Sequence, residues 1–222
     1  MTRAVTLYKE LSPVMEEQIA ILMADLTGYT ALTETHGAIT AADLIDKYIS
    51  IVENCLVGDS KLLERTGDEV MIISSSAASL LATALLLLKA TAREENFLQL
   101  HGGLHFGEVL KRHNSYFGTA INLTARITTK AQPGTFWCSA EFINALSDKS
   151  AFHFQSKGKH GFKNIQGELE MFELARDNKD IFFIDPVCRM LILDIEKAIK
   201  HPGAGDIYFC SDDCLSIYSK SS

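Results

Sequence analysis

The feature that most constrains the fold is an apolar run that stops at a carboxylate. Residues 19–24 read IAILMA and are followed directly by Asp25. Short apolar runs of this length that end at a turn signal are typical of strands buried on both faces. The sequence therefore predicts a buried strand that carries Asp25 at its end.

The elements expected after this strand alternate between helices and strands. Residues 27–30 offer N-cap residues for a helix, and apolar residues recur at helical spacing between 42 and 57. A hairpin is expected from 61 to 73, with Gly67 and Asp68 at its tip. The remaining predicted elements are a helix at 76–92, a strand at 98–110 with a bulge or close approach at its two glycines, a helix at 120–131, a strand at 135–139, a helix at 140–146 and two strands between 152 and 174. This mixed order predicts an α+β fold with helices on one face of a sheet.

Composition excludes several classes of protein. The chain has 222 residues, 47% hydrophobic and 22% charged, as in ordinary globular proteins. Its net charge of -7 argues against a nucleic-acid-binding surface. The longest apolar stretch, 77–88, is too short to cross a bilayer, and the N-terminal residues lack the apolar core of a signal peptide. We therefore expect a cytoplasmic protein without a membrane or nucleic-acid partner.

The five cysteines divide into two groups. An odd number in a reducing compartment makes paired structural disulfides unexpected. Cys55 and Cys138 stand alone and are predicted to be core residues. The other three, Cys188, Cys210 and Cys214, fall in the last 35 residues, after a polar segment at 177–180. This distribution predicts a linker followed by a second, small unit.

Asp25 and Asp68 are candidates for a metal site. Carboxylates at neighbouring strand ends can hold two divalent cations, and Mg²⁺ prefers one or two carboxylates together with substrate phosphates. The backbone N–H groups at the start of the first helix can cradle such phosphates; these residues are Leu26, Thr27, Gly28, Tyr29 and Thr30. The alternative interpretation is that Asp25 is a helix N-cap and Asp68 an ordinary turn residue.

Several motifs, taken together, resemble one known family. They are ADLTGYTALTE at 24–34, ERTGDEVM at 64–71, LHFGEV at 104–109, FGTAINLTARI at 117–127 and GFKNIQGELEMFEL at 161–174. In this order they resemble the catalytic domain of the class III adenylate and guanylate cyclases, over residues 17–176. The resemblance implies a ferredoxin-like βαββαβ core with additional strands, built to dimerise.

The resemblance also implies a role for each matching residue. Asp25 and Asp68 would bind two Mg²⁺ or Mn²⁺ ions. Asn122 would orient the ribose, and Arg126, four residues further along one helix face, would stabilise charge on the phosphates. Lys163 resembles a phosphate-binding lysine. Without the family, Arg126 would be interpreted as a solvated helix arginine. The histidines 101 and 105 are interpreted as structural.

The implied reaction converts a nucleoside triphosphate to its 3′,5′-cyclic monophosphate and pyrophosphate, in intracellular signalling. In this family the metal aspartates come from one subunit and the Asn/Arg pair from the other, so a lone domain would form a homodimer with two composite sites. The alternative is a non-catalytic nucleotide- or metal-responsive signalling module that retains the cyclase fold.

Two further positions bear on the base. Glu64 lies four residues before Asp68, where adenylate cyclases usually carry Lys. Ser115 lies seven residues before Asn122, where they usually carry Asp or Thr. A carboxylate can accept from guanine N1–H and the 2-amino group but opposes the acceptor N1 of adenine. This chemistry favours GTP, with ATP or another base left open.

The C-terminal segment resembles a second family. The sequences IDPVCRM at 184–190 and YFCSDDC at 208–214 resemble the YHS domain, although Arg189 replaces its usual Gly. Cys188, Cys210 and Cys214 would bind Zn²⁺ or another soft metal, with His201 or Asp185 as a fourth ligand. Reduced thiols or a redox pair are the alternatives. The predicted division is a cyclase domain at 17–176, a linker at 177–182 and a YHS-type metal-associated domain at 183–219.

Overall fold

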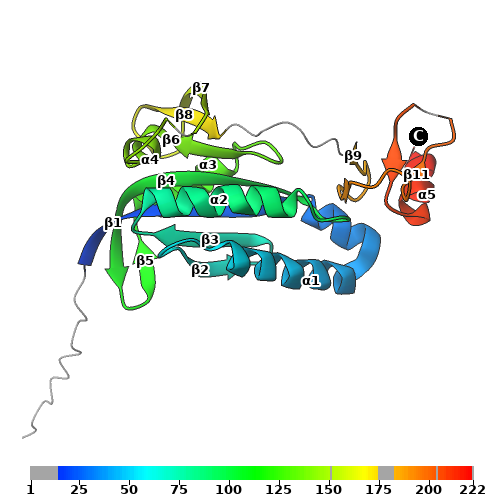
Figure 1. Ribbon diagram of the computed structural model, residues 1–222, viewed down its shortest axis with the longest axis horizontal. Helices are drawn as coiled ribbons and strands as arrows, with labels where there is room; N and C mark the ends of the chain where they lie inside the picture. The colour runs from blue at the N-terminus through cyan, green and yellow to red at the C-terminus, as the bar shows by residue number, and fades with distance from the viewer. Residues whose placement is uncertain (1–14, 151, 175–182, 204, 222) are drawn as a thin grey trace, which may run out of the picture.

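The computed structural model describes residues 15–150, 152–174, 183–203 and 205–221. An eight-stranded sheet forms the body of the molecule (Figure 1). Its strands are β1 (Met15–Thr27), β2 (Lys61–Thr66), β3 (Glu69–Ser74), β4 (Gln99–Arg112), β5 (Ser115–Phe117), β6 (Phe136–Ser139), β7 (Phe154–Gly161) and β8 (Glu168–Leu174). The helices around it are α1 (Tyr29–Cys55), α2 (Ala77–Thr91), α3 (Thr119–Thr128) and α4 (Ala140–Asn144).

The first half of the sheet is a ferredoxin-like βαββαβ unit. Its four strands lie in the order β2-β3-β1-β4 and pair antiparallel. Helix α1 connects β1 to β2, and α2 connects β3 to β4. Strand β6 then adds parallel to β4, and β8 and β7 extend the same edge. The α+β class and the core topology expected from the sequence are confirmed.

Strand β1 is central because it is apolar on both faces. Side chains alternate along a strand, so Ala20, Leu22 and Ala24 pack in the core with α1 and α2. Ile21 and Met23 pack on the opposite face, with Ala120 of α3. The expectation that the helices cover one face is therefore wrong. A strand that is apolar on both sides needs cover on both sides, and α3 supplies the second.

Helix α1 begins at the N-cap segment 27–30 that the sequence predicted, well before the stretch with hydrophobic periodicity. It starts at Tyr29, and Gly37, with φ 83°, kinks it where two helices meet. Its N-cap is Gly28, which has a left-handed φ of 94° and makes no side-chain capping hydrogen bond. The stretch before Ala41 is largely exposed and lacks an apolar stripe, which is why the pattern missed it.

The close packing of α3 on the sheet depends on Gly103. A Cβ at this glycine would lie 2.7 Å from the backbone nitrogen of Thr128. The Thr128 hydroxyl donates to the carbonyl oxygen of Met23 at 3.2 Å. The glycine pair in β4 thus marks the close approach that the sequence predicted, and it ties the end of α3 to β1 just before Asp25.

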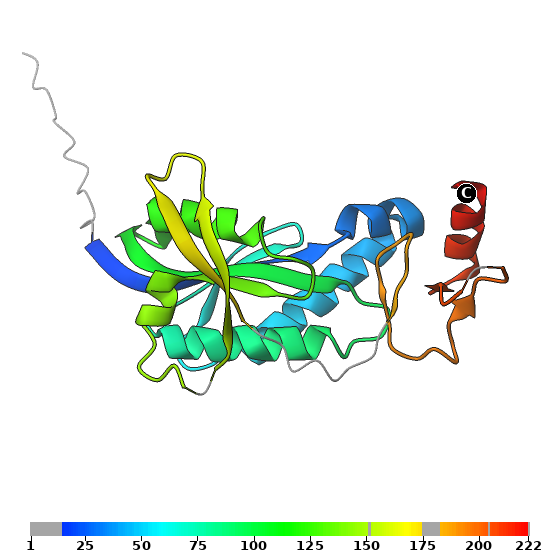
Figure 2. The same cartoon turned by 90° about the horizontal axis from the view of Figure 1, so that it is seen from above.

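The last part of the chain forms a small unit at one end of the sheet (Figure 2). It contains β9 (Phe183–Ile184), β10 (Leu191–Ile192), β11 (Ile199–Lys200), β12 (Tyr208–Phe209) and α5 (Asp212–Ser221). We call residues 183–221 the tail. Its backbone bonds to the segment before β4: Asn96 N–H donates to Leu191 O at 3.1 Å, and Leu191 N–H donates to Phe97 O at 2.6 Å. The linker predicted at 177–182 lies outside the described residues.

The structure also bears on membrane insertion. Within the part of the chain that is described, none of the helices combines the length and apolarity that a membrane span requires.

Candidate active site and a thiol cluster

The structure brings Asp25 and Asp68 together. Asp25 lies near the end of β1, and Asp68 sits in the tight turn between β2 and β3. Because Ala24 pairs with Val70 across the sheet, the turn is held beside the end of β1. The two carboxyl groups are close enough to share a hydrogen bond. The predicted carboxylate pair is therefore present as a geometric unit.

Burial and mutual repulsion raise the pKa values of both carboxyl groups. Desolvation, followed by the charge of Asp25, raises the pKa of Asp68 to about 6. Desolvation is also the main cause that raises the pKa of Asp25. Glu69 adds a third carboxyl group, whose pKa is raised by burial and by Asp68. Clustered oxygen donors of this kind suit Mg²⁺ or Mn²⁺, so the residues present fit a divalent cation.

Glu69 and His101 lie beside the carboxylate pair. The sequence motifs predict no role for Glu69, and from the sequence His101 is interpreted as structural, whereas the structure places His101 against Asp25. Glu69 is adjacent to Asp68 in the ERTGDEVM segment, and that adjacency was the available signal. His101 pairs with Asp25 across β1 and β4, and its Nε2 lies 3.9 Å from Asp25 Oδ2. Its Nδ1 hydrogen-bonds the Thr27 hydroxyl at 3.0 Å. Burial lowers the pKa of His101. His105, in contrast, is buried, and its Nδ1 forms a hydrogen bond with Ser139 Oγ at 2.8 Å, in keeping with a structural role.

The start of α1 lies directly after Asp25. Gly28 turns the chain, and its carbonyl oxygen accepts from Leu32 N–H at 2.9 Å in the first helical bond. The first N–H groups of a helix have no partner within the helix and carry partial positive charge. We call the segment 26–30 the substrate loop, after the role that the sequence predicts for it. It joins the end of β1 to the start of α1, where helix N–H groups suited to an anion lie beside the carboxylate pair.

Glu64 and Ser115 lie at opposite ends of the sheet. Glu64 pairs with Met71, and Met71 with Met23, so Glu64 shares a sheet face with Asp25. Ser115 pairs with Arg112, which is nine residues along β4 from the partner of Met23, Gly103. At about 3.3 Å per residue, that separation is about 30 Å.

Helix α3 presents its polar residues away from the sheet. Its apolar side is buried, whereas Asn122 is exposed and Arg126 is half-buried. Lys163, which is exposed, follows Phe162 in the turn between β7 and β8. Phe162 packs in one cluster with Leu123 of α3. The three cationic or amide side chains expected to contact substrate thus come from the α3 side of the sheet.

The three tail cysteines form a second cluster. The Sγ atom of Cys210 lies 3.4 Å from that of Cys188 and 3.7 Å from that of Cys214. All three are free thiols. The hydrogen bond with Cys188, followed by burial, raises the pKa of Cys210, and burial raises the pKa of Cys214 to about 12. The structure thus brings the predicted thiol ligands together. The isolated Cys55 and Cys138 are buried, as the sequence predicted.

The two residues considered as a fourth ligand make other contacts. The Asp185 carboxylate accepts backbone N–H groups of Val187, Cys188 and Cys210 at 2.8–3.2 Å. The His201 ring packs edge-on against Tyr218, and its Nδ1 accepts from Gly203 N–H at 3.1 Å. The residue that joins the three sulfurs is instead His36 of α1. A partner so distant in sequence gave no local pattern.

Sequence comparisons place the body of the chain in a known family. Residues 12–176 match the family described as the adenylate and guanylate cyclase catalytic domain. A pH-sensitive adenylate cyclase from Mycobacterium tuberculosis is 26% identical over 72% of this chain and 41% of its own length. An adenylate cyclase from Glutamicibacter nicotianae is 29% identical over 70% of this chain and 39% of its own. The chain thus matches about two fifths of the length of these relatives.

Solved structures agree on the fold. The adenylyl cyclase CyaB of Pseudomonas aeruginosa superposes with a TM-score of 0.66 at 15% identity, covering 76% of this chain and 99% of that one. An adenylate cyclase of Trypanosoma brucei gives 0.67 at 17% identity, covering 87% and 95%. The chain therefore has the fold of these cyclase catalytic domains. The chain belongs to the adenylate and guanylate cyclase catalytic domain family.

Proposed function

We propose that this protein is a nucleotidyl cyclase that converts GTP or ATP to the 3′,5′-cyclic monophosphate and pyrophosphate by a two-metal mechanism. The observation that carries the proposal is the contact between Asp25 and Asp68 beside the N-terminus of α1. Adjacent carboxylates are suited to bind divalent cations, and the neighbouring helix start is suited to bind phosphate. The family match gives this arrangement its chemical context.

Each residue has a defined task in this proposal. Asp25 and Asp68 hold the two ions, which when bound neutralise the triphosphate and activate the ribose 3′-hydroxyl. The N–H groups of the substrate loop bind phosphate oxygens. Asn122 orients the ribose, while Arg126 and Lys163 stabilise charge on the phosphates.

The reaction is intramolecular, so positioning dominates catalysis. The 3′-oxygen loses its proton and forms a bond to the α-phosphorus. The bond from that phosphorus to the bridging oxygen breaks, and pyrophosphate leaves with its electrons. The chain's part is to hold the hydroxyl in line with the leaving oxygen and to place Arg126 against the developing charge.

We further propose a homodimer with composite sites. Glu64 and Ser115 are separated by about 30 Å along one chain, yet both positions are expected to contact the base. A two-fold axis would bring Ser115 and α3 of one subunit to the carboxylate pair of its partner, giving two equivalent sites. Mixing Asp25→Asn and Arg126→Ala chains tests this, because each heterodimer regains one intact site. We expect recovery of about one quarter of wild-type activity, and no recovery would contradict composite sites.

The base is the open part of the proposal, and two observations favour different answers. The relatives named above are adenylate cyclases, which favours ATP. Glu64 is an exposed carboxylate on the face that carries Asp25, and its acceptor oxygens suit guanine. The deciding experiment offers ATP, GTP, CTP and UTP to the purified chain with Mg²⁺ or Mn²⁺ and measures cyclic product.

That assay also tests the proposed activity itself. We expect one purine nucleotide to be cyclised, with equal release of pyrophosphate, and Asp25→Asn to abolish both. Tight nucleotide binding without pyrophosphate from any nucleotide would instead support a non-catalytic signalling module.

The domain division completes the proposal. We assign residues 17–176 to the cyclase domain and 183–219 to a YHS-type, metal-associated unit. Because nucleoside triphosphates are held inside cells, we place both in the cytoplasm.

A further inference from the structure

Four potential metal ligands from distant parts of the chain meet at one point. Cys188 lies in the turn after β9, whereas Cys210 and Cys214 flank the start of α5. The fourth, His36, belongs to α1 and directly precedes its kink at Gly37. One donor atom from each of these residues lies within 4.8 Å of all the others. The cluster therefore joins the tail to the cyclase domain.

The separations within the cluster match the edges of a small tetrahedron. With Zn–S bonds of about 2.3 Å and Zn–N bonds of about 2.0 Å, a tetrahedral site has S···S edges of about 3.8 Å and S···N edges of about 3.5 Å. The Cys210 sulfur lies 3.4 and 3.7 Å from the other two sulfurs. His36 Nε2 lies 3.7 Å from Cys210 Sγ and 3.6 Å from Cys214 Sγ. These distances suit one ion at the centre.

The backbone around the cluster is held in place without an ion. The buried carboxylate of Asp185 accepts from the backbone N–H groups of Cys188 and Cys210, and so connects two of the ligand-bearing segments. Ser211 accepts from Cys214 N–H at 3.3 Å at the start of α5. Cys188 and Cys214 are fully buried. Supported ligands that are closed off from solvent are typical of structural metal sites.

We propose that His36, Cys188, Cys210 and Cys214 bind one zinc-class ion, which fastens the tail to the start of α1. Three thiolates and an imidazole select a soft or borderline cation, and four protein ligands leave no open position for chemistry. An iron–sulfur cluster is disfavoured because its ligands surround several atoms, whereas these donors surround one. The ion differs in kind from the oxygen-bound cations of the carboxylate pair.

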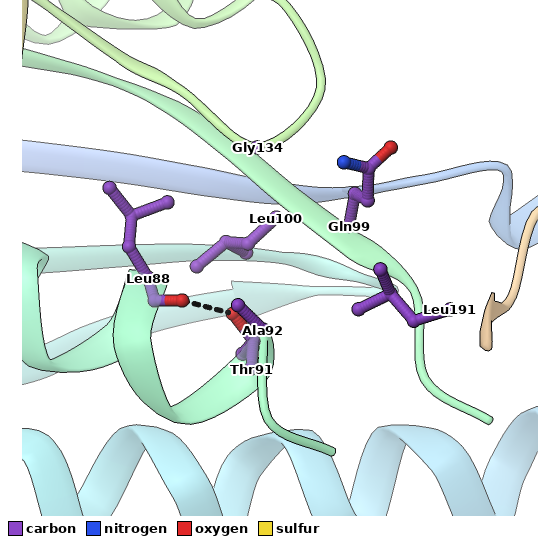
Figure 3. Close-up of a pocket in the computed structure, with 7 residues that line it drawn as sticks. All are labelled: Leu88, Thr91, Ala92, Gln99, Leu100, Gly134 and Leu191. Atoms are coloured by element: carbon purple, nitrogen blue, oxygen red, sulfur yellow. Dashed lines mark hydrogen bonds between the residues drawn. The ribbon is translucent and has the colours of Figure 1, made fainter. Parts of the chain in front are cut away.

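The contacts between the tail and the cyclase domain indicate what a bound ion would add to their attachment. Besides the cluster, the tail bonds to the cyclase domain through the backbone of Leu191 and through the bridge between Leu98 and Met190. The Glu95 carboxylate also accepts from Leu193 N–H at 3.1 Å and Asp194 N–H at 3.2 Å. Met190 and Phe209 of the tail are buried in the same hydrophobic cluster as α1 and α2. Figure 3 shows Leu191 beside Gln99 and Leu100, around a void of about 10 Å³ that is too small for a ligand. A metal site that includes His36 would add to these contacts a bond between the tail and the start of α1.

The proposed metal site is also connected to the substrate loop, through the residue that follows Cys188. Arg189, which follows Cys188, has a left-handed φ of 68°, and its side-chain stem lies against Gly28. A Cβ built at Gly28 would be 2.6 Å from Arg189 Cβ. Fixing Cys188 therefore fixes Arg189 over the loop proposed to bind phosphates. This consequence for activity rests on the proposed function, whereas the metal site does not.

The first experiment measures zinc on the purified full-length chain. We expect one equivalent of zinc by elemental analysis, and a cobalt-substituted form with the absorption of tetrahedral thiolate coordination. His36→Asn should lower zinc affinity by more than the about 100-fold that follows loss of a residue that only supports a ligand. The matched control is His201→Asn, which should retain wild-type affinity. Absence of zinc binding in the wild type, or loss in His201→Asn with retention in His36→Asn, would overturn the proposal.

The second experiment tests the fastening by hydrogen exchange. The amides of Leu191 and Leu193 bond to the cyclase domain, so removal of zinc or His36→Asn should make them exchange at least about tenfold faster. Unchanged exchange after complete loss of zinc would refute the fastening role. Asp25→Asn should keep both zinc and protection while abolishing turnover, so failure of the proposed cyclase activity remains distinguishable from failure of the metal site.

Discussion

The carboxylate pair and the thiol cluster are two ligand sets within one chain, built on opposite principles. Asp25 and Asp68 are half-buried oxygen donors at strand ends, open to a substrate. Cys188 and Cys214 are fully buried sulfur donors, and they meet the half-buried Cys210 and His36 where the tail contacts α1. Hard oxygen ligands with free positions suit a cation that must also bind phosphate, whereas a closed soft set suits an ion that holds structure.

Because the two sets share no residue, we expect a substitution that abolishes metal binding at one of them to leave metal binding at the other unchanged. The carboxylates belong to the sheet and need no residue from the tail. Among the described residues, the thiol cluster takes one ligand, His36, from the cyclase domain, and His36 is not part of the hydrophobic core under the sheet. Substitutions in one set should therefore leave the metal content of the other unchanged.

The largest expected effect comes from the carboxylate pair. Asp25→Asn keeps the shape of the side chain but removes a charged cation ligand. We expect the rate of cyclic nucleotide formation to fall by about 10³-fold or more, because electrostatic stabilisation of the phosphates is lost. The measurement is product formation at saturating nucleotide, alongside zinc content. The matched change, Cys210→Ser, should lower zinc content and leave Mg²⁺ or Mn²⁺ affinity intact. A joint loss in either variant would break the distinction between the two sets.

A smaller effect is expected on base selection. The double change Glu64→Lys, Ser115→Asp replaces groups suited to guanine by groups suited to adenine. We expect the ratio of ATP to GTP turnover to rise by about 10- to 100-fold. Each single change should give only part of the shift, because both positions are proposed to contact one base. An unchanged ratio would show that neither residue reads the base, while leaving the carboxylate pair as the cation site.

The contrast between the sets also explains what the sequence could predict. Local patterns were enough for β1, the β2–β3 hairpin and α2, because burial on a strand and an apolar helix leave strong periodic signals. They also placed Asp25 and Asp68, since each lies at the end of a strand. The closing topology and the site roles came from the order of five motifs that resemble one family.

What the sequence could not predict depends on contacts between distant segments. Helix α3 covers the second face of the sheet because β1 is apolar on both sides. The sequence pattern shows that β1 is apolar but does not tell which helix packs on which of its faces. His36 is 152 residues from Cys188 and sits in an exposed stretch of α1, so no spacing rule connects them. His101 reaches Asp25 only through the register of β1 and β4. Tertiary placement, not residue type, defines these roles.

Gly28 of the substrate loop lies against Arg189 of the tail. Substitution of Gly28 should lower the free energy of unfolding by about 2 kcal/mol. In Gly28→Ala the left-handed φ of 94° becomes strained, and the new methyl group meets the Arg189 stem. Chemical denaturation measures the loss. Adding Arg189→Gly should recover the part due to the contact but not the part due to φ. If the two changes show no coupling, Arg189 does not pack on the substrate loop in solution.

The smallest effect is a pH dependence that belongs to the carboxylate pair alone. Folding raises the pKa of Asp68 from 3.8 to about 6, so between these values the folded protein binds a proton that the unfolded chain does not. Without divalent cations, this group's contribution therefore stabilises the fold as pH falls from 7.5 to 5 and is lost as pH rises through 6. Because Asp68 is half-exposed, screening limits the effect to about 1–2 kcal/mol. Asp68→Asn should flatten the pH dependence of the free energy of unfolding and stabilise the metal-free protein at pH 7.5. Saturating Mg²⁺ should flatten the wild-type profile in the same way, whereas His36→Asn should leave it unchanged. A wild-type profile that Mg²⁺ does not alter would mean that the pair does not bind the cation.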